Sequence, residues 1–330
     1  MNRPSQTGAR EDRVGLETLG FRGHDLKRPE CVLATRSGVL LAADWDGGVT
    51  RIGPDGAITR YLAATPGMKP NGIALRRDGS FLLAHLGDGS GGLFHLDRSG
   101  TLIPLLTEID GQPLPPSNYV LEDAEGRIWL TVSTRRQPRD LGYRPDIDDG
   151  FIVLLHRGQA RLVADGLGYT NEVQIDPSGD WLYVNETFAR RLSRFPLAAD
   201  GSLGRKELVA EFGPGSFPDG LAFDREGAAW ITSIVSNRVI RVLPDGRQQI
   251  ILEDSDPAHL DWVEQAYLAG ELGRPHLDRV ESRVLRNISS LAFGGPDLKT
   301  AYLGCLLGDR IASFPVPVAG LPPVHWEYPA

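Results

Sequence analysis

Six polar side chains recur at the same point of a repeated sequence unit, and their types suit one kind of chemistry. They follow one another at intervals of roughly 40 to 70 residues and are Glu30, Asn71, Asn118, Asn171, Asp219 and Ser289. Carboxylate and amide oxygens are hard donors of the kind that Ca²⁺ and Mg²⁺ prefer. The absence of Cys and His from the set argues against a dedicated zinc site. The residues favour a hard divalent cation, with a water-filled polar channel as the alternative.

The unit that carries these residues reads as short strands joined by tight turns. Copies include KPNGIALRRDGSFLLAH from Lys69, TNEVQIDPSGDWLYVNE from Thr170 and FPDGLAFDREGAAWITS from Phe217. Apolar alternation around DG, SG or EG dipeptides is typical of β-hairpins. Six copies, each with room for four antiparallel strands, predict an all-β, six-bladed β-propeller that forms one domain over residues 1–330. The first strand of each blade would line the central channel, so the six polar residues would form a ring around the axis.

Two insertions interrupt the repeat. One covers residues 133–150 in the third unit, and the other covers residues 254–280 before the last blade. The second predicts a helix, because Asp256 is a good N-cap and Pro257 is favoured at the first helical position. Long insertions in a compact fold are usually functional or disordered. We expect both to form lids over one end of the channel, with inert surface loops as the alternative.

Composition and charge indicate which kinds of molecule the protein can bind. The net charge of −8 argues against binding to nucleic acid, which needs a basic surface. The chain has neither the apolar core of a secretory signal at its start nor an apolar run of membrane-spanning length, so we expect a cytoplasmic protein that acts on a small molecule. Cys31 and Cys305 are too few for a disulfide framework. Two reduced thiols are the expectation, with a single bridge as the alternative.

Four segments of the chain resemble the family of gluconolactonases, senescence marker protein (regucalcin) and bacterial drug-responsive lactonases. They are RPE at residues 28–30, Asn118 before EDAEGRIWLT, TNEVQIDPSGDWLYVNET from Thr170 and FPDGLAFDREGAAWIT from Phe217. The resemblance runs from about Pro29 to Pro315. It implies a six-bladed propeller hydrolase that opens a lactone or a related small cyclic ester.

The resemblance also implies roles for individual residues. Glu30, Asn171 and Asp219 would hold a Ca²⁺ ion, for which Mg²⁺, Mn²⁺ or Zn²⁺ could substitute. Asn118 would complete the metal shell, directly or through water, or would contact the substrate and take part in catalysis. Asp219 would activate the attacking water or act itself as the nucleophile.

Some positions depart from the family pattern. Many gluconolactonases carry an Arg for sugar hydroxyls two residues before Asn118, where this chain has Pro116. The resemblance therefore supports a very polar aldonolactone as substrate less strongly. Trp262 and Tyr267 on the inserted helix could instead form an apolar roof over the site for a bulkier substrate. Asn71 and His85 are candidate substrate contacts, with structural roles as the alternative.

Two other functions remain open from the sequence. The first is a non-hydrolytic propeller enzyme that performs a cyclisation, an isomerisation or a condensation, as the strictosidine synthases do on the same architecture. The second is a binding propeller in which a metal only plugs the channel. Fold alone cannot decide among these chemistries.

Overall fold

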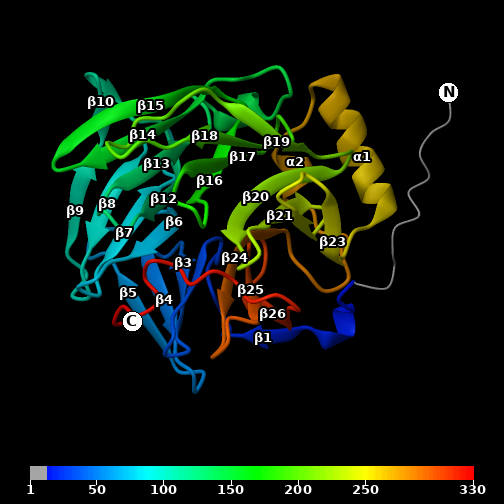
Figure 1. Cartoon of the computed structure of the whole chain (residues 1–330), viewed down its shortest axis with the longest axis horizontal. Helices are drawn as coiled ribbons and strands as arrows, with labels where there is room; N and C mark the ends of the chain where they lie inside the picture. Colours follow the sequence, from blue (N-terminus) through cyan, green and yellow to red (C-terminus); the bar gives the residue numbers. More distant parts are fainter. Residues whose placement is uncertain (1–12) are drawn as a thin grey trace.

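The computed structural model of the chain describes residues 13–330. The first twelve residues, whose sequence lacks the apolar run of a secretory signal, lie outside that range. Six four-stranded antiparallel sheets surround a central axis (Figure 1). This confirms the six-bladed propeller that the repeat predicts. Within residues 13–330, no helix is long and apolar enough to cross a membrane.

Each of the first five blades is built from four consecutive strands, with the innermost strand first. Blade 1 consists of β2 (Val32–Ala34), β3 (Leu40–Asp44), β4 (Gly48–Ile52) and β5 (Ile58–Leu62). Blade 2 consists of β6 (Pro70–Leu75), β7 (Phe81–His85), β8 (Gly92–Leu96) and β9 (Leu102–Leu106). Blade 3 consists of β12 (Ser117–Glu122), β13 (Ile128–Val132), β14 (Gly150–His156) and β15 (Gln159–Leu167). A small hairpin of β10 (Glu108–Ile109) and β11 (Gln112–Pro113) joins blades 2 and 3.

The remaining blades complete the ring. Blade 4 consists of β16 (Thr170–Ile175), β17 (Trp181–Glu186), β18 (Arg191–Pro196) and β19 (Glu207–Glu211). Blade 5 consists of β20 (Ser216–Phe223), β21 (Ala229–Val235), β22 (Arg238–Val242) and β23 (Gln248–Glu253). Blade 6 combines β24 (Ile288–Gly294), β25 (Thr300–Cys305) and β26 (Ile311–Pro315) with the N-terminal strand β1 (Gly20–Arg22). Because Phe21 pairs with Ala312, the two ends of the propeller share one sheet.

A repeated turn explains why blades 3 and 5 have closely similar sequences. Asp123 and Asp224 each accept hydrogen bonds from the backbone of the turn that follows them. Each also accepts a hydrogen bond from a fully buried indole, Trp129 Nε1 at 2.9 Å and Trp230 Nε1 at 2.8 Å. Burial of a large indole is favourable only when its N–H has a partner. The EDAEGRIW and FDREGAAW segments therefore fix the turn and the packing between blades together.

Backbone irregularities occur where the innermost strands carry the polar ring. The pairing register shifts between Pro70 and Ile73 in β6, and equivalent shifts occur in β12, β16, β20 and β24. Such bulges re-aim side chains relative to a regular strand. The residues skipped by the register are the ring residues Asn71, Asn118, Asn171, Asp219 and Ser289, in each case alone or with the following residue.

Both insertions have local helical structure. Residues 133–149 include a 3₁₀ turn, η3 (Arg139–Gly142), and a second 3₁₀ turn, η2 (Leu16–Thr18), precedes β1. The predicted helix is present as α1 (Pro257–Ala269), and the Asp256 carboxylate accepts a hydrogen bond from the His259 N–H at 2.7 Å. A short α2 (Arg274–Leu277) follows. Cys31 and Cys305 are buried free thiols, as the sequence led us to expect.

The C-terminal segment crosses one end of the channel. The Leu321 N–H donates to the Phe223 carbonyl of blade 5 at 2.8 Å, and the Arg36 N–H of blade 1 donates to the Trp326 carbonyl at 2.9 Å. In Figure 1 this red segment runs from the last blade toward β3 and β4. It helps to enclose a cavity of about 320 Å³ whose other walls come from blades 1 to 4. The lid insertions lie around a different cavity, described below.

Candidate active site

The four residues predicted as metal ligands line one small cavity near the axis. Glu30, Asn118, Asn171 and Asp219 are all buried, and the cavity that they share has a volume of about 30 Å³. A space of this size holds one water molecule or one ion. The structure therefore brings together the side chains that the sequence places in separate blades.

Hydrogen bonds turn the amide groups so that oxygen remains available. The Nδ2 of Asn171 donates to the Thr187 hydroxyl at 3.0 Å, and that hydroxyl donates to the Pro218 carbonyl at 2.8 Å. The Nδ2 of Asn118 donates to the Ser133 hydroxyl at 2.9 Å. Each amide nitrogen already donates a hydrogen bond to the protein. Each Oδ1 can therefore coordinate a metal ion.

The two carboxylates differ in their surroundings. Glu30 Oε2 accepts a hydrogen bond from Arg28 Nε at 3.0 Å. Among residues 13–330, Asp219 has no basic nitrogen within 4.0 Å, and it is only 4% exposed. Burial, and then the nearby charge of Glu30, raise the pKa of Asp219 well above its usual value. An anionic pair of this kind needs a cation to remain ionised at neutral pH.

The donor set fits a hard divalent cation better than zinc. No group of three or more His, Cys, Asp or Glu side chains that could hold an ion is found in the described part of the chain. The set here has two carboxylates, and amide oxygens must supply the rest. Oxygen-only ligation with two negative charges matches the preference of Ca²⁺ and, less closely, of Mg²⁺.

The predicted contacts Asn71 and His85, and the ring residue Ser289, do not line this cavity. Asn71 Nδ2 donates to the backbone carbonyl of Asn118 at 3.1 Å and to its Oδ1 at 3.3 Å. The Ser289 hydroxyl donates to the Glu30 carbonyl at 2.7 Å. His85 Nδ1 accepts the Lys69 N–H at 3.1 Å, and burial lowers the pKa of this imidazole. In this geometry Asn71 and Ser289 orient two of the predicted ligands, and His85 fixes the backbone of Lys69.

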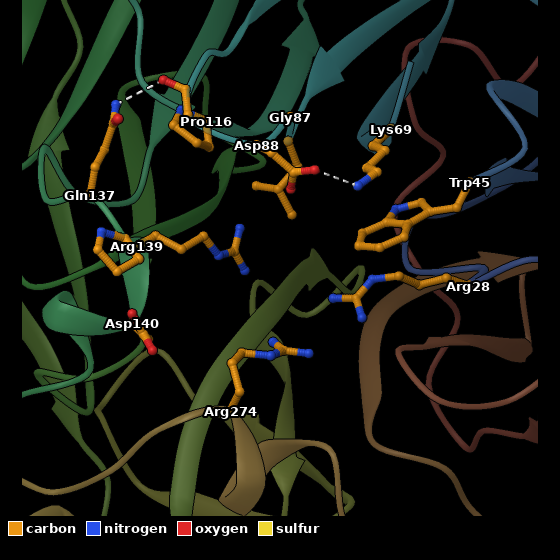
Figure 2. Close-up of a pocket in the computed structure, with 13 residues that line it drawn as sticks. Arg28, Trp45, Lys69, Gly87, Asp88, Pro116, Gln137, Arg139, Asp140 and Arg274 are labelled. Carbon is orange, nitrogen blue, oxygen red and sulfur yellow. Dashed lines mark hydrogen bonds and ion pairs between the residues drawn. The ribbon is translucent and has the colours of Figure 1, made fainter. Parts of the chain in front are cut away.

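Figure 2 shows a larger cavity, of about 540 Å³, that shares lining residues with the small one. Arg28, Arg139 and Arg274 line both cavities. Trp45 and Lys69 line only the larger one. Arg139 belongs to the first insertion and Arg274 to the second, so both insertions contribute walls. The site therefore consists of a small cavity that holds the predicted metal ligands and a wider, basic mouth.

The basic residues of the mouth were not predicted from the sequence, although one signal in the repeat could have found two of them. Arg28 and Lys69 stand two residues before Glu30 and Asn71, which is the same offset at which Pro116 precedes Asn118. Both basic residues lie in the segments that lead into the innermost strands β2 and β6, and both line the larger cavity, so this offset marks positions nearer the mouth. Arg139 and Arg274 lie in insertions without repeat equivalents, and no spacing rule locates them.

Trp262 and Tyr267 do not form the apolar roof that we expected. Trp262 is 38% exposed and packs against the His276 ring, with 4.3 Å between centroids. Tyr267 is buried against Phe217, and its hydroxyl donates to the Phe188 carbonyl at 2.6 Å. Tyr267 therefore anchors the helix. The apolar part of the wall of the small cavity comes from other residues, namely Tyr143, Tyr169, Phe188, Ile234, Leu277 and Leu306.

A further buried carboxyl lies one position beyond the ring. Glu172 follows Asn171 and is 6% exposed, and its Oε2 accepts the Leu221 N–H at 2.8 Å. Burial raises the pKa of Glu172 well above its usual value. The equivalent position in blade 5 is Gly220, where a Cβ would lie 2.5 Å from the Ser289 carbonyl oxygen. The innermost strands of blades 5 and 6 therefore pack closely at this level.

Comparison with known proteins identifies the family of this chain. The family model described as SMP-30/Gluconolactonase/LRE-like region matches residues 28–254. A 6-deoxy-6-sulfogluconolactonase from Pseudomonas putida is 31% identical over 285 residues, which cover 83% of this chain and 81% of that relative. The fold is shared with a gluconolactonase from Xanthomonas campestris (TM-score 0.66, 20% identity, 89% of this chain and 88% of that one). It is also shared with a calcium-binding regucalcin from Agrobacterium tumefaciens (TM-score 0.64, 18% identity, 91% and 96%). The chain belongs to the SMP-30/gluconolactonase/LRE-like family.

Proposed function

We propose that this protein is a metal-dependent hydrolase that opens a lactone or a related small cyclic ester. The observation that carries the proposal is the set of oxygen donors, Glu30, Asn118, Asn171 and Asp219, around one cavity below an open mouth. Family membership supports the reaction class, since relatives are named as lactonases of sugar acids. The Pseudomonas putida relative is named for a gluconolactone with a sulfo group.

The residues of the site have different roles in the proposed reaction. When bound to Glu30, Asn171 and Asp219, with Asn118 as a fourth ligand or a substrate contact, a divalent cation supplies a Lewis acid for the lactone carbonyl. Asp219 accepts the proton of the attacking water as the water oxygen bonds to the carbonyl carbon. The ring C–O bond then breaks, and the former ring oxygen takes up a proton to give the hydroxy acid. In the variant mechanism the Asp219 carboxylate attacks the carbonyl carbon itself, and the ring C–O bond breaks as the ring oxygen takes up a proton. Water then hydrolyses the resulting acyl–Asp219 anhydride, which gives the hydroxy acid and restores the Asp219 carboxylate.

Asp219 suits this role better than Glu30. Glu30 already accepts a hydrogen bond from Arg28 at 3.0 Å. Asp219 has no basic partner within 4.0 Å among the described residues, so its carboxylate is free to accept a proton from water.

The decisive experiment is a pH-indicator assay on a panel of lactones and aryl esters. Protein treated with EDTA should be inactive, and Ca²⁺, Mn²⁺, Mg²⁺ or Zn²⁺ should restore acid release to different extents. Asp219→Asn should lose roughly 10²- to 10⁴-fold in kcat, the range that one positioned proton acceptor supplies. Asp245→Asn, at an exposed turn where the carboxylate pairs with Arg247, is the matched control.

Three outcomes would contradict the proposal. Full turnover by Asp219→Asn with metal still bound would remove Asp219 from the chemistry. Loss of thermal stability with EDTA, without hydrolysis of any substrate, would support a metal-plugged binding propeller. Consumption of a substrate without release of acid would point to a non-hydrolytic enzyme.

A further inference from the structure

The mouth of the site carries more positive charge than its surroundings balance. Figure 2 shows the guanidinium groups of Arg28, Arg139 and Arg274 pointing into the same space, with Lys69 at its edge. The chain as a whole has a net charge of −8, so this local cluster of positive charges is opposite in sign to the net charge of the protein. Like charges that converge in a partly enclosed cavity repel one another, and a bound anion removes that repulsion.

Ion pairs account for only part of this charge. Lys69 pairs with Asp88 at 3.0 Å, and Arg274 Nε pairs with Asp278 at 3.1 Å. Arg28 pairs with Glu30, a predicted metal ligand whose charge a cation would share. For Arg139, no carboxylate lies within 4.0 Å among residues 13–330. Asp88 and Asp140 are the carboxylates that line this cavity, and Asp140 makes no ion pair among the described residues. A cation at the ring would therefore leave four basic side chains of the mouth facing two carboxylates.

Two buried donors at the mouth also lack acceptors. Nη1 of Arg139 and Nε1 of Trp45 are both buried, and neither has a hydrogen-bond partner among the described residues. The Arg28 guanidinium stacks on the Trp45 ring, 4.3 Å from its centroid, which fixes it on the side of the mouth across from Arg139. Buried donors without acceptors are unfavourable, and an oxyanion in this space would satisfy them.

We propose that the natural substrate is a lactone with a substituent that is anionic at neutral pH, a sulfonate, phosphate or carboxylate, and that Arg139 binds this substituent together with Arg28 and Arg274. This inference rests on the proposed lactonase function. The reacting carbonyl would lie at the small cavity beside Asp219, and the charged substituent would occupy the wider cavity of about 540 Å³. Guanidinium groups recognise all three oxyanions through charge-assisted hydrogen bonds.

One competing role for the arginines is stabilisation of the charge that develops on the reacting carboxyl group. That role predicts equal losses on charged and neutral substrates when an arginine is removed. A site for a substituent predicts losses on charged substrates alone. The two roles therefore separate in a comparison of matched lactones.

The first test compares glucono-δ-lactone with its 6-phospho, 6-deoxy-6-sulfo and 6-carboxylate analogues. At least one charged lactone should exceed the neutral one in kcat/KM. Arg139→Met should lose roughly 10- to 100-fold on that charged lactone, the range of one charge-assisted pair, and should change the neutral one little. Arg139→Lys should recover part of the loss. Equal losses on both lactones would overturn the proposal.

Two further variants serve as a control and as a replacement in this test. Arg144→Met is the matched control, because Arg144 lies on the same insertion, is 43% exposed and pairs with Asp146 at 2.8 Å away from the mouth. It should behave as the unmodified protein on every lactone. If Arg139→Met does not fold, Arg274→Met provides the same comparison from the second insertion.

A binding measurement separates failure of this inference from failure of the lactonase proposal. Isothermal titration at fixed ionic strength would compare glucose with glucose 6-phosphate, 6-deoxy-6-sulfoglucose and glucuronate, none of which is a lactone. Tighter binding of a charged sugar that Arg139→Met abolishes supports the anion site even if no lactone is opened. Equal binding of glucose and all three charged sugars contradicts it even if lactones are hydrolysed.

Discussion

At the axis of the propeller, Glu30 and Asp219 place two carboxylates beside a cavity of about 30 Å³. Their mutual repulsion and their burial are unfavourable unless a cation is present. A ligand that binds only the folded state stabilises it, by about 2.7 kcal/mol at a hundredfold excess over its dissociation constant. The free energy of unfolding should therefore depend on metal even where no reaction is followed.

Glu30→Gln should remove most of this dependence. The substitution keeps one oxygen donor and deletes one of the two charges that attract the ion. Thermal melts with EDTA and with added CaCl₂ should show a clear rise in Tm for the unmodified protein and little rise for the variant. Glu125→Gln, which removes a carboxylate that is 61% exposed, is the control and should keep the full rise. A full rise in Glu30→Gln would exclude Glu30 as a ligand.

The sequence predicted the polar ring but not the basic residues of the mouth, and the difference has a physical reason. Repeats place equivalent residues around an axis, so Glu30, Asn171 and Asp219 could be brought together from their positions in the repeat. Arg139 and Arg274 lie in insertions that have no counterpart in the other repeats. The path of each insertion depends on its tertiary packing, which the repeat pattern does not predict. The bulges that aim the ring residues could not be located either, because they arise from pairing between strands.

Among the elements, helix α1 shows how an insertion is fixed to the propeller. Glu264 accepts two hydrogen bonds from Arg190, at 2.9 and 2.6 Å, and a third from the Gly215 N–H at 3.0 Å. Arg190 lies over the Tyr267 ring, 3.7 Å from its centroid. The helix precedes α2, which carries Arg274, so its anchoring also positions part of the basic mouth.

Glu264→Gln should destabilise the protein by about 2 kcal/mol, because it leaves the largely buried Arg190 without its charged partner. Urea unfolding followed by circular dichroism would measure the change in the free energy of unfolding. Glu271→Gln lies just beyond the same helix on an exposed side chain and should change that free energy by less than about 0.5 kcal/mol. Similar small effects in both variants would show that the Arg190–Glu264 pair does not anchor the helix.

The sequence predicted the existence of this helix better than its contacts. The Asp256 cap and Pro257 at the first helical position are local signals, and both are confirmed. The orientation of Tyr267 toward Phe217, and of Trp262 toward His276, was outside the reach of such signals. Helical periodicity alone does not say which surface the apolar face meets.

On the scale of the whole molecule, the C-terminal segment covers the end of the channel opposite the mouth. Its His325 has a buried Nε2 without a hydrogen-bond partner among the described residues, and burial lowers the pKa of this imidazole to about 4. The folded state therefore resists protonation of His325, whereas the unfolded chain binds a proton near the usual pKa of about 6.5. Stability from this group is present above about pH 6.5 and falls as the pH drops toward 4.

His325→Gln should reduce the acid sensitivity of the protein. Between pH 7.5 and pH 5, the Tm of the unmodified protein should fall more than that of the variant. Parallel Tm profiles for the unmodified protein and His325→Gln would contradict the assignment.

The pairing of β1 with β26 has a consequence for the order in which the molecule folds. Phe21 and Ala312 are separated by almost the whole described chain, whereas the first five blades pair strands that are close in sequence. The entropy lost on closing a loop grows with its length, so the long closure should follow formation of the local sheets. Phe21→Ala should then speed unfolding with little change in the refolding rate in stopped-flow experiments. Val184→Ala inside blade 4 should slow refolding as well, and a slowed refolding limb for Phe21→Ala would mean that the ring closes early.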